Sequence, residues 1–403
     1  MYIIKLGGIN MQSLEKWKIL YKEQMDDYFL PFWNEQFLDK ENGGYFTCVD
    51  RDGNVYSTDK SVWFQGRVGY IFAHIYNTYK KEQKYLEISK SCVDFMDKHC
   101  FDTDGRMYFT VTKEGHPLRK RRYYYSETFY IIANAELYVA TKDKKYLENA
   151  KKVFSLAYSI YLDSKADPFQ IYPKSNPKTR SYKTLGPSMI MLNVVNILKS
   201  ADKENAEYYA PISIKLIEEI KNNFYKPEHK FVVENVNLDG SLDLDFPEGR
   251  HQNPGHAIEA AWFILNEYAE NKSEEYLKMA LNIIDFSLKA GWDTENGGIK
   301  YFTDCQNKPV VQLEANLKLW WPHNEAIIAT LFAYKITGEK KYLDWFERLS
   351  EYTLSHFPDE KGKEWFGYLT QKGEVNNDYK GSFFKGPFHI PRMLMKVLEL
   401  LEN

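Results

Sequence analysis

The sequence predicts an all-α protein in which six helical hairpins close into a ring, an (α/α)6 toroid, over residues 1–403 as a single domain. Three observations predict this fold. Similar helix openings recur along the chain, and amphipathic helices alternate with helices that are apolar on nearly every side. In addition, no linker rich in Pro, Gly or Ser divides the 403 residues.

The outer layer of the ring is predicted from five helices that open on a tyrosine and keep one charged face. Intervals of 61, 62, 68 and 66 residues between these tyrosines indicate a structural repeat. The openings are KYLEIS at Tyr85, KYLENA at Tyr146, EYYAPI at Tyr208, EYLKMA at Tyr276 and KYLDWF at Tyr342. Residues 14–33 supply the sixth outer helix.

The inner layer is predicted from six helices that are apolar nearly all round, as buried helices are. They cover residues 62–76, 123–138, 187–198, 254–268, 322–334 and 388–401. Turn-rich segments with short aromatic or β-branched runs indicate small β-hairpins at the end of the ring where the active site is expected. These segments are 41–54, 102–115, 228–241, 295–308 and 363–374. A closed ring is favoured over an open solenoid, because a solenoid needs polar caps and the last helix is apolar.

Composition and missing motifs exclude several classes of function. The net charge is −3 and no basic stripe is present, so no nucleic-acid partner is expected. No apolar run is long enough for a bilayer, the first residues lack a signal-peptide pattern, and four cysteines lack metal-like spacing, so a reduced, cytoplasmic protein is expected. Phosphate loops, dinucleotide turns and nucleophile elbows are absent. Aromatic residues, at 16%, suit a helical core or a pocket that stacks sugars.

A polar residue recurs near the start of each inner helix. The intervals are 60, 66, 66, 66 and 67 residues. The residues are Arg67, Glu127, Asn193, Glu259, Glu325 and Arg392. Because successive inner helices run parallel in such a ring, these groups are expected to converge at one mouth and line a polar cavity. A structural girdle of salt bridges, in which the arginines neutralise the carboxylates, is the alternative, and the two are compatible.

Two histidines fall at the same mouth. His256 follows an Asn-Pro-Gly turn, and His389 precedes Pro391 at the start of the last inner helix. A helix N-terminus disfavours imidazolium, so both are expected to be neutral and able to accept a proton near pH 7. Buried structural histidines are the alternative. A metal site of His251, His256 and Glu259 is not expected, because the Pro-Gly turn breaks the regular ligand spacing.

Six stretches of the chain are similar to one known family. They are VWFQGR (62–67), SETFY (126–130), GRHQNPGHAIEAAWF (249–263), WWPHNEA (320–326), KEWFGYL (363–369) and KGPFHIPR (385–392). The chain resembles the N-acylglucosamine 2-epimerases, which include the mammalian renin-binding proteins. GRHQNPGH resembles the acylglucosamine branch rather than the cellobiose enzymes. The resemblance implies an (α/α)6 toroid, usually dimeric and independent of metal, that interconverts N-acetylglucosamine and N-acetylmannosamine.

The resemblance also implies roles for individual residues. His256 and His389 fall on the family's acid–base pair, which would move the C2 proton of the open-chain sugar from one face to the other. Arg67 falls on an arginine near the sugar oxygens, Glu325 on an essential glutamate, and Glu259 is expected to orient His256. Register and resemblance together give the substrate-binding candidates Glu127, Asn193, His251, Glu259, Trp321, Lys385 and Arg392.

The expected partners are a small amino sugar and a second copy of the chain in a homodimer, without a membrane. No metal or cofactor is expected to be required. Several relatives respond to ATP as an allosteric activator, but no phosphate-binding loop is recognisable here. Other functions stay open: a related sugar 2-epimerase or aldose–ketose isomerase of cellobiose or mannose type, an (α/α)6 glycoside hydrolase using Glu259 and Glu325, or a non-catalytic binding toroid.

Overall fold

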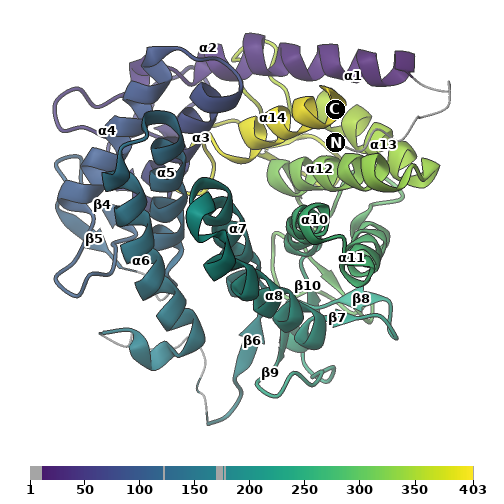
Figure 1. The fold of residues 1–403 in the computed structure, drawn as a ribbon. Coiled ribbons are helices and arrows are strands. Elements are labelled where there is room, and N and C mark those ends of the chain that lie inside the picture. The colour runs from purple at the N-terminus through teal and green to yellow at the C-terminus, as the bar shows by residue number, and fades with distance from the viewer. Residues whose placement is uncertain (1–10, 121–122, 169–175, 177, 403) are drawn as a thin grey trace.

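Six helices form an inner ring in the computed structural model, which describes residues 11–120, 123–168, 176 and 178–402 (Figure 1). They are α3 (Val62–Thr78), α5 (Tyr125–Thr141), α7 (Leu185–Ala201), α10 (Pro254–Asn271), α12 (Trp320–Thr337) and α14 (His389–Glu402). Each helix contacts the next one in this order, and α14 also contacts α3. The ring is therefore closed, which confirms the predicted (α/α)6 toroid.

The outer helices pack one by one against the inner ones (Figure 1). They are α4 (Gln83–His99), α6 (Lys144–Leu162), α8 (Ala206–Asn223), α11 (Glu274–Gly291) and α13 (Lys340–His356). The first outer segment packs on α14 and is composite, because α1 (Met11–Glu23) continues through a π-helix (Gln24–Phe29) into α2 (Leu30–Phe32). One regular helix was the expectation for residues 14–33, so this detail of the prediction is wrong.

The tyrosine repeat is displaced by one residue in the third outer helix. The tyrosines that open the other four helices are at most 7% exposed, and they are Tyr85, Tyr146, Tyr276 and Tyr342. Tyr208, the predicted equivalent, is 57% exposed, whereas the next residue, Tyr209, is 1% exposed. The buried repeat position is therefore Tyr209, and the assignment of Tyr208 to it is wrong.

Short antiparallel strands connect neighbouring repeats at the end where the inner helices begin. The strands are β1 (Cys48–Val49), β2 (Val55–Ser57), β3 (Lys60–Ser61), β4 (Thr110–Val111), β5 (Pro117–Arg119), β6 (Tyr182–Thr184), β7 (Tyr225–Lys226), β8 (Phe231–Val232), β9 (Asn235–Asn237), β10 (His251–Gln252), β11 (Thr303–Asp304), β12 (Lys318–Leu319), β13 (Tyr368–Leu369) and β14 (Val375–Asn377). The strand before an inner helix pairs with a strand of the following repeat, as in β3–β4, β6–β9, β10–β11 and β12–β13.

One of the predicted hairpins is wrong in its pairing, because segment 295–308 contributes β11, which pairs with β10 of the preceding repeat. In segment 228–241, β8 forms a hairpin with the adjacent β7, whereas β9 pairs with β6. The hairpins β1–β2, β4–β5 and β13–β14 form near the predicted segments 41–54, 102–115 and 363–374. A short helix, α9 (Pro247–Arg250), leads into β10.

Buried lysines hold the loops around this end of the ring. Each lysine side chain is fully buried and donates a hydrogen bond to an aspartate. The pairs are Lys60–Asp39 at 2.8 Å, Lys318–Asp293 at 2.7 Å and Lys380–Asp359 at 2.9 Å. Lys60 and Lys318 lie on the strands β3 and β12, directly before inner helices. These pairs therefore fix the backbone at the points where two inner helices begin.

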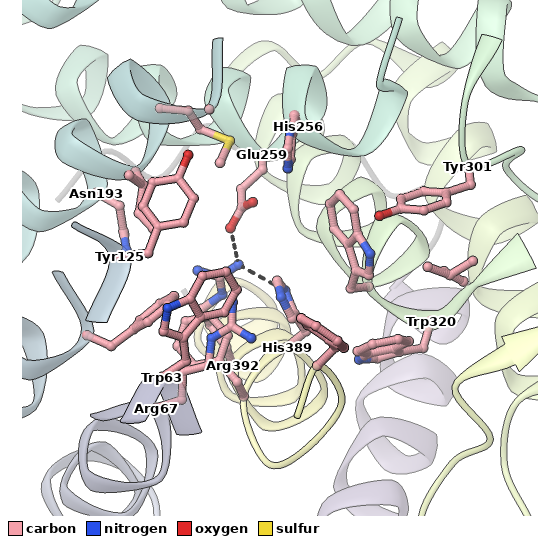
Figure 2. A pocket seen from close by; sticks show the side chains of 18 of the residues that line it. Trp63, Arg67, Tyr125, Asn193, His256, Glu259, Tyr301, Trp320, His389 and Arg392 are labelled. Carbon is pink, nitrogen blue, oxygen red and sulfur yellow. Dashed lines mark hydrogen bonds and ion pairs between the residues drawn. The ribbon is translucent and has the colours of Figure 1, made fainter. Parts of the chain in front are cut away.

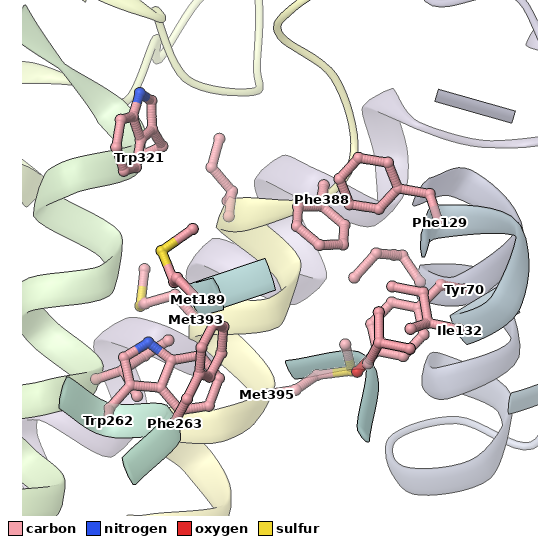
Figure 3. Packing of buried hydrophobic residues seen from close by; sticks show 14 of the residues in the cluster. Tyr70, Phe129, Ile132, Met189, Trp262, Phe263, Trp321, Phe388, Met393 and Met395 are labelled. Atoms are coloured by element: carbon pink, nitrogen blue, oxygen red, sulfur yellow. The ribbon is translucent and has the colours of Figure 1, made fainter. Parts of the chain in front are cut away.

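Apolar side chains fill the centre of the ring (Figure 3). Tyr70 of α3, Ile132 of α5, and Met393 and Met395 of α14 are all at most 7% exposed. These side chains fill the centre of the ring, so any space at the N-terminal ends of the inner helices has an apolar base. In the described residues, none of the helices combines the length and apolar character that a bilayer crossing demands.

Candidate active site

A cavity of about 740 Å³ opens at the N-terminal ends of the inner helices. Seven of the predicted site residues line it: Arg67, Asn193, His256, Glu259, Trp321, His389 and Arg392. Figure 2 shows His256 and His389 on facing sides of this space, with Arg67 and Asn193 on the walls between them. The spacing of polar residues along the sequence therefore predicted a shared cavity correctly for most of its members.

Glu127 was expected at the cavity and lies behind its wall. Its side chain is fully buried, and Oε1 accepts hydrogen bonds from Nε of Arg106 at 2.6 Å and from the backbone N–H of Met107. Arg106 also pairs with Asp167 at 2.6 Å. Glu127 lies in the first turn of α5 but faces the loop before it, so the arginine of that loop takes its charge. Its placement at the cavity is a wrong prediction.

Lys385 and His251 also lie outside the cavity lining. Lys385 is fully buried, and Nζ donates to the backbone oxygen of Lys380 at 2.7 Å and pairs with Glu364 at 3.3 Å. His251 belongs to β10, and its ring packs against Phe302 with 4.6 Å between the ring centres. Burial lowers the pKa of His251. The expected direct contact of these two residues with a sugar is not supported by their positions.

The Asn-Pro-Gly turn has a defined structural purpose at the start of α10. Oδ1 of Asn253 accepts a hydrogen bond from the backbone N–H of His256 at 3.2 Å, and Pro254 occupies the first helical position. Gly255 makes room for a neighbour, because a Cβ atom there would lie 2.5 Å from the ring of Trp321. The turn thus fixes His256 and lets Trp321 approach it.

Glu234 holds the ring of His256. Nδ1 of His256 lies 3.1 Å from both carboxylate oxygens of Glu234. Glu259 was expected to orient His256 but instead binds Arg392. Helical spacing places His256 and Glu259 on one face of α10, but it does not determine which residue each side chain binds. Glu234 was missed because it lies in the hairpin region before β9, and the one signal for it is an acidic residue directly after the apolar run FVV.

Glu325 lies beneath the cavity wall and supports His389. Its side chain is fully buried, and Oε1 lies 2.8 Å from Nδ1 of His389 and 2.6 Å from Nη2 of Arg392. The other oxygen, Oε2, accepts a hydrogen bond from Nε1 of Trp262 at 2.8 Å. Arg392 also reaches Glu259 at 2.5 Å, so it bridges the two glutamates. Part of the alternative salt-bridge girdle therefore exists together with the cavity.

The two histidines have opposite electrostatic surroundings. Burial lowers the pKa of His256, but the charge and hydrogen bond of Glu234 outweigh burial, and the pKa ends above its ordinary value. Burial and the positive charges of Arg392 and Arg67 hold the pKa of His389 well below its ordinary value. Glu234 therefore favours the protonated form of His256, an influence that the argument from the helix N-terminus left out, whereas the lowered pKa of His389 has the expected direction.

Trp321 lies between these histidines. Its ring centre is 5.4 Å from that of His256 and 5.6 Å from that of His389. An indole face of this kind provides an apolar wall against which a sugar carbon can rest while each histidine approaches it. Trp321 therefore lies where a substrate-binding candidate was expected, in the lining of the cavity.

The side chain of Arg67 reaches the cavity between the aromatic rings of Phe129 and Phe388. Its guanidinium carbon lies 4.3 Å from the ring centre of Phe129 and 4.7 Å from that of Phe388. Nε of Arg67 is buried and has no hydrogen-bond partner among the described residues. Burial lowers the pKa of Arg67 to about 9, while Glu259 opposes that shift. Arg67 therefore places a positive charge at the cavity, and its Nε–H group is not paired with another described residue.

Aromatic rings that were not among the predicted site residues make up much of the cavity wall. They are Trp63, Tyr125, Phe129, Phe263, Tyr301, Trp320, Tyr368, Phe384 and Phe388. The high aromatic content was a signal for such a pocket, but composition alone does not separate pocket rings from core rings. A small cavity with aromatic walls, two histidines and an arginine is suited to acid–base chemistry on a sugar.

Comparisons with known proteins identify the family. The sequence profile described as N-acylglucosamine 2-epimerase (GlcNAc 2-epimerase) matches residues 44–387. N-acylglucosamine 2-epimerase of Rattus norvegicus is 35% identical over 398 residues, covering 97% of this chain and 93% of the rat protein. The human N-acylglucosamine 2-epimerase is 34% identical over 402 residues, covering 97% of this chain and 91% of that protein.

A solved structure is similar in fold. Cellobiose 2-epimerase from Bacillus thermoamylovorans B4167 superposes with a TM-score of 0.83 at 21% identity, covering 96% of this chain and 99% of that one. This likeness supports the toroid, and the sequence matches confirm the family resemblance. The chain therefore belongs to the N-acylglucosamine 2-epimerase family of isomerases.

Proposed function

We propose that the protein interconverts N-acetylglucosamine and N-acetylmannosamine by moving the proton at C2 from one face of the open-chain sugar to the other. The observation that carries this proposal is the placement of His256 and His389 on facing sides of one cavity, each close to Trp321. Inversion at one carbon needs a base on one face and an acid on the other. Two histidines that differ in their tendency to hold a proton meet that need.

In the proposed reaction, a neutral His389 removes the C2 proton and a protonated His256 supplies a proton to the opposite face. The roles are exchanged when the other epimer enters. Removal of the proton next to the aldehyde places negative charge on the C1 oxygen, and the free guanidinium of Arg67 stabilises that charge. Glu234 and Glu325 act as positioning residues, since each binds Nδ1 of a histidine and leaves Nε2 for the substrate.

An N-acyl preference is supported by the part of the lining that α7 contributes. Asn193 faces the cavity (Figure 2), and Met189 and Ile190 of the same helix line it together with Phe263. An amide side chain beside an apolar surface matches the amide and the methyl group of an acetamido substituent. The related activities on cellobiose or mannose have no equivalent argument from these residues.

A glycoside hydrolase is less well supported by the same cavity. Hydrolysis needs one protonated carboxyl and one carboxylate on the two sides of a glycosidic bond. Glu259 and Glu325 instead bind the same nitrogen of Arg392, at 2.5 and 2.6 Å. That contact pairs both carboxylates with one cation and fills the space between them. A binding protein without activity does not need one histidine with a raised pKa and another with a lowered pKa in the same cavity.

The proposal is tested by incubating the protein with N-acetylmannosamine in deuterated water and following the products by NMR. N-acetylglucosamine with deuterium at C2 is the expected product. Parallel incubations use mannose and cellobiose as substrates, and further samples contain EDTA or ATP, since we propose that no metal or cofactor is required. Absence of both product and C2 label with the N-acetyl sugar, together with turnover of mannose or cellobiose, would overturn the proposal. The homodimer and the cytoplasmic location stay predictions.

A further inference from the structure

Three side chains around Arg392 form a group that is typical of metal sites. One carboxylate oxygen from each of Glu259 and Glu325 and one ring nitrogen of His389 all lie within 4.8 Å of one another. All three residues are at most 8% exposed. Carboxylate oxygens and an imidazole nitrogen are ligands that zinc and related divalent ions bind in proteins.

The guanidinium of Arg392 lies at the centre of this group. Its Nη2 atom is 2.5 Å from Oε1 of Glu259, 2.6 Å from Oε1 of Glu325 and 3.3 Å from Nδ1 of His389. A single cationic nitrogen therefore contacts all three side chains. Two buried carboxylates without a cation would be strongly destabilising, so the position requires a positive charge.

The surroundings also resemble those of a metal site. Nε1 of Trp262 donates to Oε2 of Glu325 at 2.8 Å, a contact of the kind that orients metal-binding carboxylates. Nε of Arg392 is buried and has no partner in the part of the chain that the structure describes. The hydrogen bonds that the structure gives this guanidinium among the described residues all come from Nη2, so the two carboxylates are its main anchors, as they would be for a bound ion.

We propose that Glu259, Glu325 and His389 form a divalent-metal type of site whose resident cation is the guanidinium of Arg392. In the native protein this positive charge belongs to the chain, so it does not exchange with ions in solution and a chelator does not remove it. Removal of the arginine side chain turns the three groups into a site for one first-row divalent ion. The inference concerns binding, so it does not depend on the proposed epimerase activity.

The ligand atoms have to rearrange slightly to accept a metal. Bonds of about 2.1 Å place the ligands of a tetrahedral ion about 3.4 Å apart. The ligand atoms here lie at most 4.8 Å from one another, and Nδ1 of His389 lies only 2.8 Å from Oε1 of Glu325, so these two must separate to bind one ion. Loss of the guanidinium leaves room for that movement, and the repulsion between two unpaired carboxylates favours a cation. Three protein ligands would leave a fourth position for water.

The test uses Arg392→Ala, purified free of metal and titrated with Co²⁺, whose visible absorption reports coordination. We expect one equivalent to bind, a higher Tm with Co²⁺ than without it, and displacement of Co²⁺ by Zn²⁺. The native protein is expected to show no such band. Arg67→Ala is the matched control, because it removes the other cavity arginine and leaves Arg392 in place. Arg392→Ala combined with Glu259→Gln is expected to lose the Co²⁺ band.

A second variant, Arg392→Ser, covers the case in which Arg392→Ala does not fold by itself. Both proteins are refolded with and without Co²⁺ and compared by circular dichroism. Folding that depends on Co²⁺ supports the site. Three outcomes overturn the proposal: a folded variant that binds no more Co²⁺ than the native protein, a double variant that binds as well as the single one, or two variants that Co²⁺ does not rescue.

Discussion

Both carboxylate oxygens of Glu234 lie 3.1 Å from Nδ1 of His256. The corresponding nitrogen of His389 instead lies 2.8 Å from Glu325 and 3.3 Å from the guanidinium of Arg392. One imidazole therefore has a carboxylate as its direct partner, while the other has an ion pair that includes a nearby positive charge. Burial lowers the pKa of both histidines, but Glu234 outweighs it and raises the pKa of His256, whereas Arg392 adds to it and the pKa of His389 falls well below its ordinary value.

The first prediction concerns Glu234→Gln and the alkaline side of the pH profile. The carboxylate favours the imidazolium of His256, so its removal lowers the pKa of that histidine. The protonated fraction then falls at a lower pH, and the alkaline limb of kcat/KM moves towards neutrality. The acidic limb, which depends on His389, is expected to stay in place. Since the two histidines titrate as a pair, the limbs report macroscopic pKa values.

Glu228→Gln is the control for this change. Glu228 is exposed at the loop between β7 and β8 and carries the same charge as Glu234. Its variant is expected to keep the native profile. A profile of Glu234→Gln that coincides with the native one would show that Glu234 does not set the protonation of His256.

The second prediction separates the two histidines. His256→Asn and His389→Asn are each expected to reduce epimerisation by about 10²- to 10⁴-fold, the usual contribution of a general acid or base. A variant that keeps the histidine facing the C2 proton of one epimer can still remove that proton and return deuterium to the same face. Each variant is therefore expected to exchange C2 hydrogen in one epimer only, and the two variants are expected to differ in which epimer that is.

His229→Asn provides the matched control, because the side chain of His229 is 48% exposed and lies outside the cavity. It is expected to behave as the native protein does. If either cavity variant epimerises at nearly the native rate, the corresponding histidine has a packing role, and the two-histidine mechanism is wrong.

The third prediction concerns Arg67→Met, which is expected to lower kcat without lowering the Tm. The methionine can fill the space between the rings of Phe129 and Phe388. The variant also removes a buried Nε that has no partner among the described residues. Thermal unfolding is therefore expected at the native Tm or above it. Loss of one charged donor to a developing oxyanion is expected to lower kcat by about 10²- to 10³-fold.

The exposed Arg119, which lies over the ring of Phe109, is the matching arginine outside the cavity. Arg119→Met should change neither kcat nor Tm. A fall in Tm for Arg67→Met in parallel with its fall in kcat would instead indicate that Arg67 is needed for the fold.

The periodicity of the sequence predicted the ring and most of the cavity, because both follow from local patterns. An interval of 60 to 67 residues brings Arg67, Asn193, Glu259 and Arg392 to the same level of successive inner helices. Glu127 also lies at this interval, but its side chain points away from the cavity, because Arg106 in the loop before α5 binds it. Sequence spacing gives the height of a residue on its helix, while its side-chain direction depends on where the counterion lies.

The pairing of charges was the part that spacing did not predict. Glu259 lies three residues after His256, yet its partner is Arg392, which is 133 positions further along the chain. Glu234 lies 22 positions before His256 and is held beside it by backbone hydrogen bonds to His251 and Leu185. Similarly, EYY offers two adjacent tyrosines, and packing selects Tyr209. Such choices depend on contacts between repeats, which no local pattern contains.

The last prediction concerns the buried pair of Lys318 and Asp293, which fixes the start of α12. Nζ of Lys318 donates to Asp293 at 2.7 Å and to the backbone oxygen of Gly297 at 2.8 Å. Lys318→Met leaves the buried carboxylate without its cation and is expected to reduce the free energy of unfolding by about 3–5 kcal/mol at neutral pH. The equivalent change at the exposed pair of Lys341 and Asp285 should cost about 0–1 kcal/mol.

The pH dependence of that loss identifies its cause. Burial raises the pKa of Asp293, but Lys318 and the backbone N–H of Glu295 outweigh burial and lower it to about 2. A depressed folded-state pKa stabilises the native protein above the unfolded-state pKa, which is about 3.9, and this contribution disappears as the pH falls towards 2. In Lys318→Met the carboxyl takes up a proton at higher pH. The difference in unfolding free energy between the two proteins is therefore expected to shrink on acidification, measured by urea unfolding at several pH values. A difference that stays constant with pH would assign the loss to packing of the lysine side chain instead of to its charge.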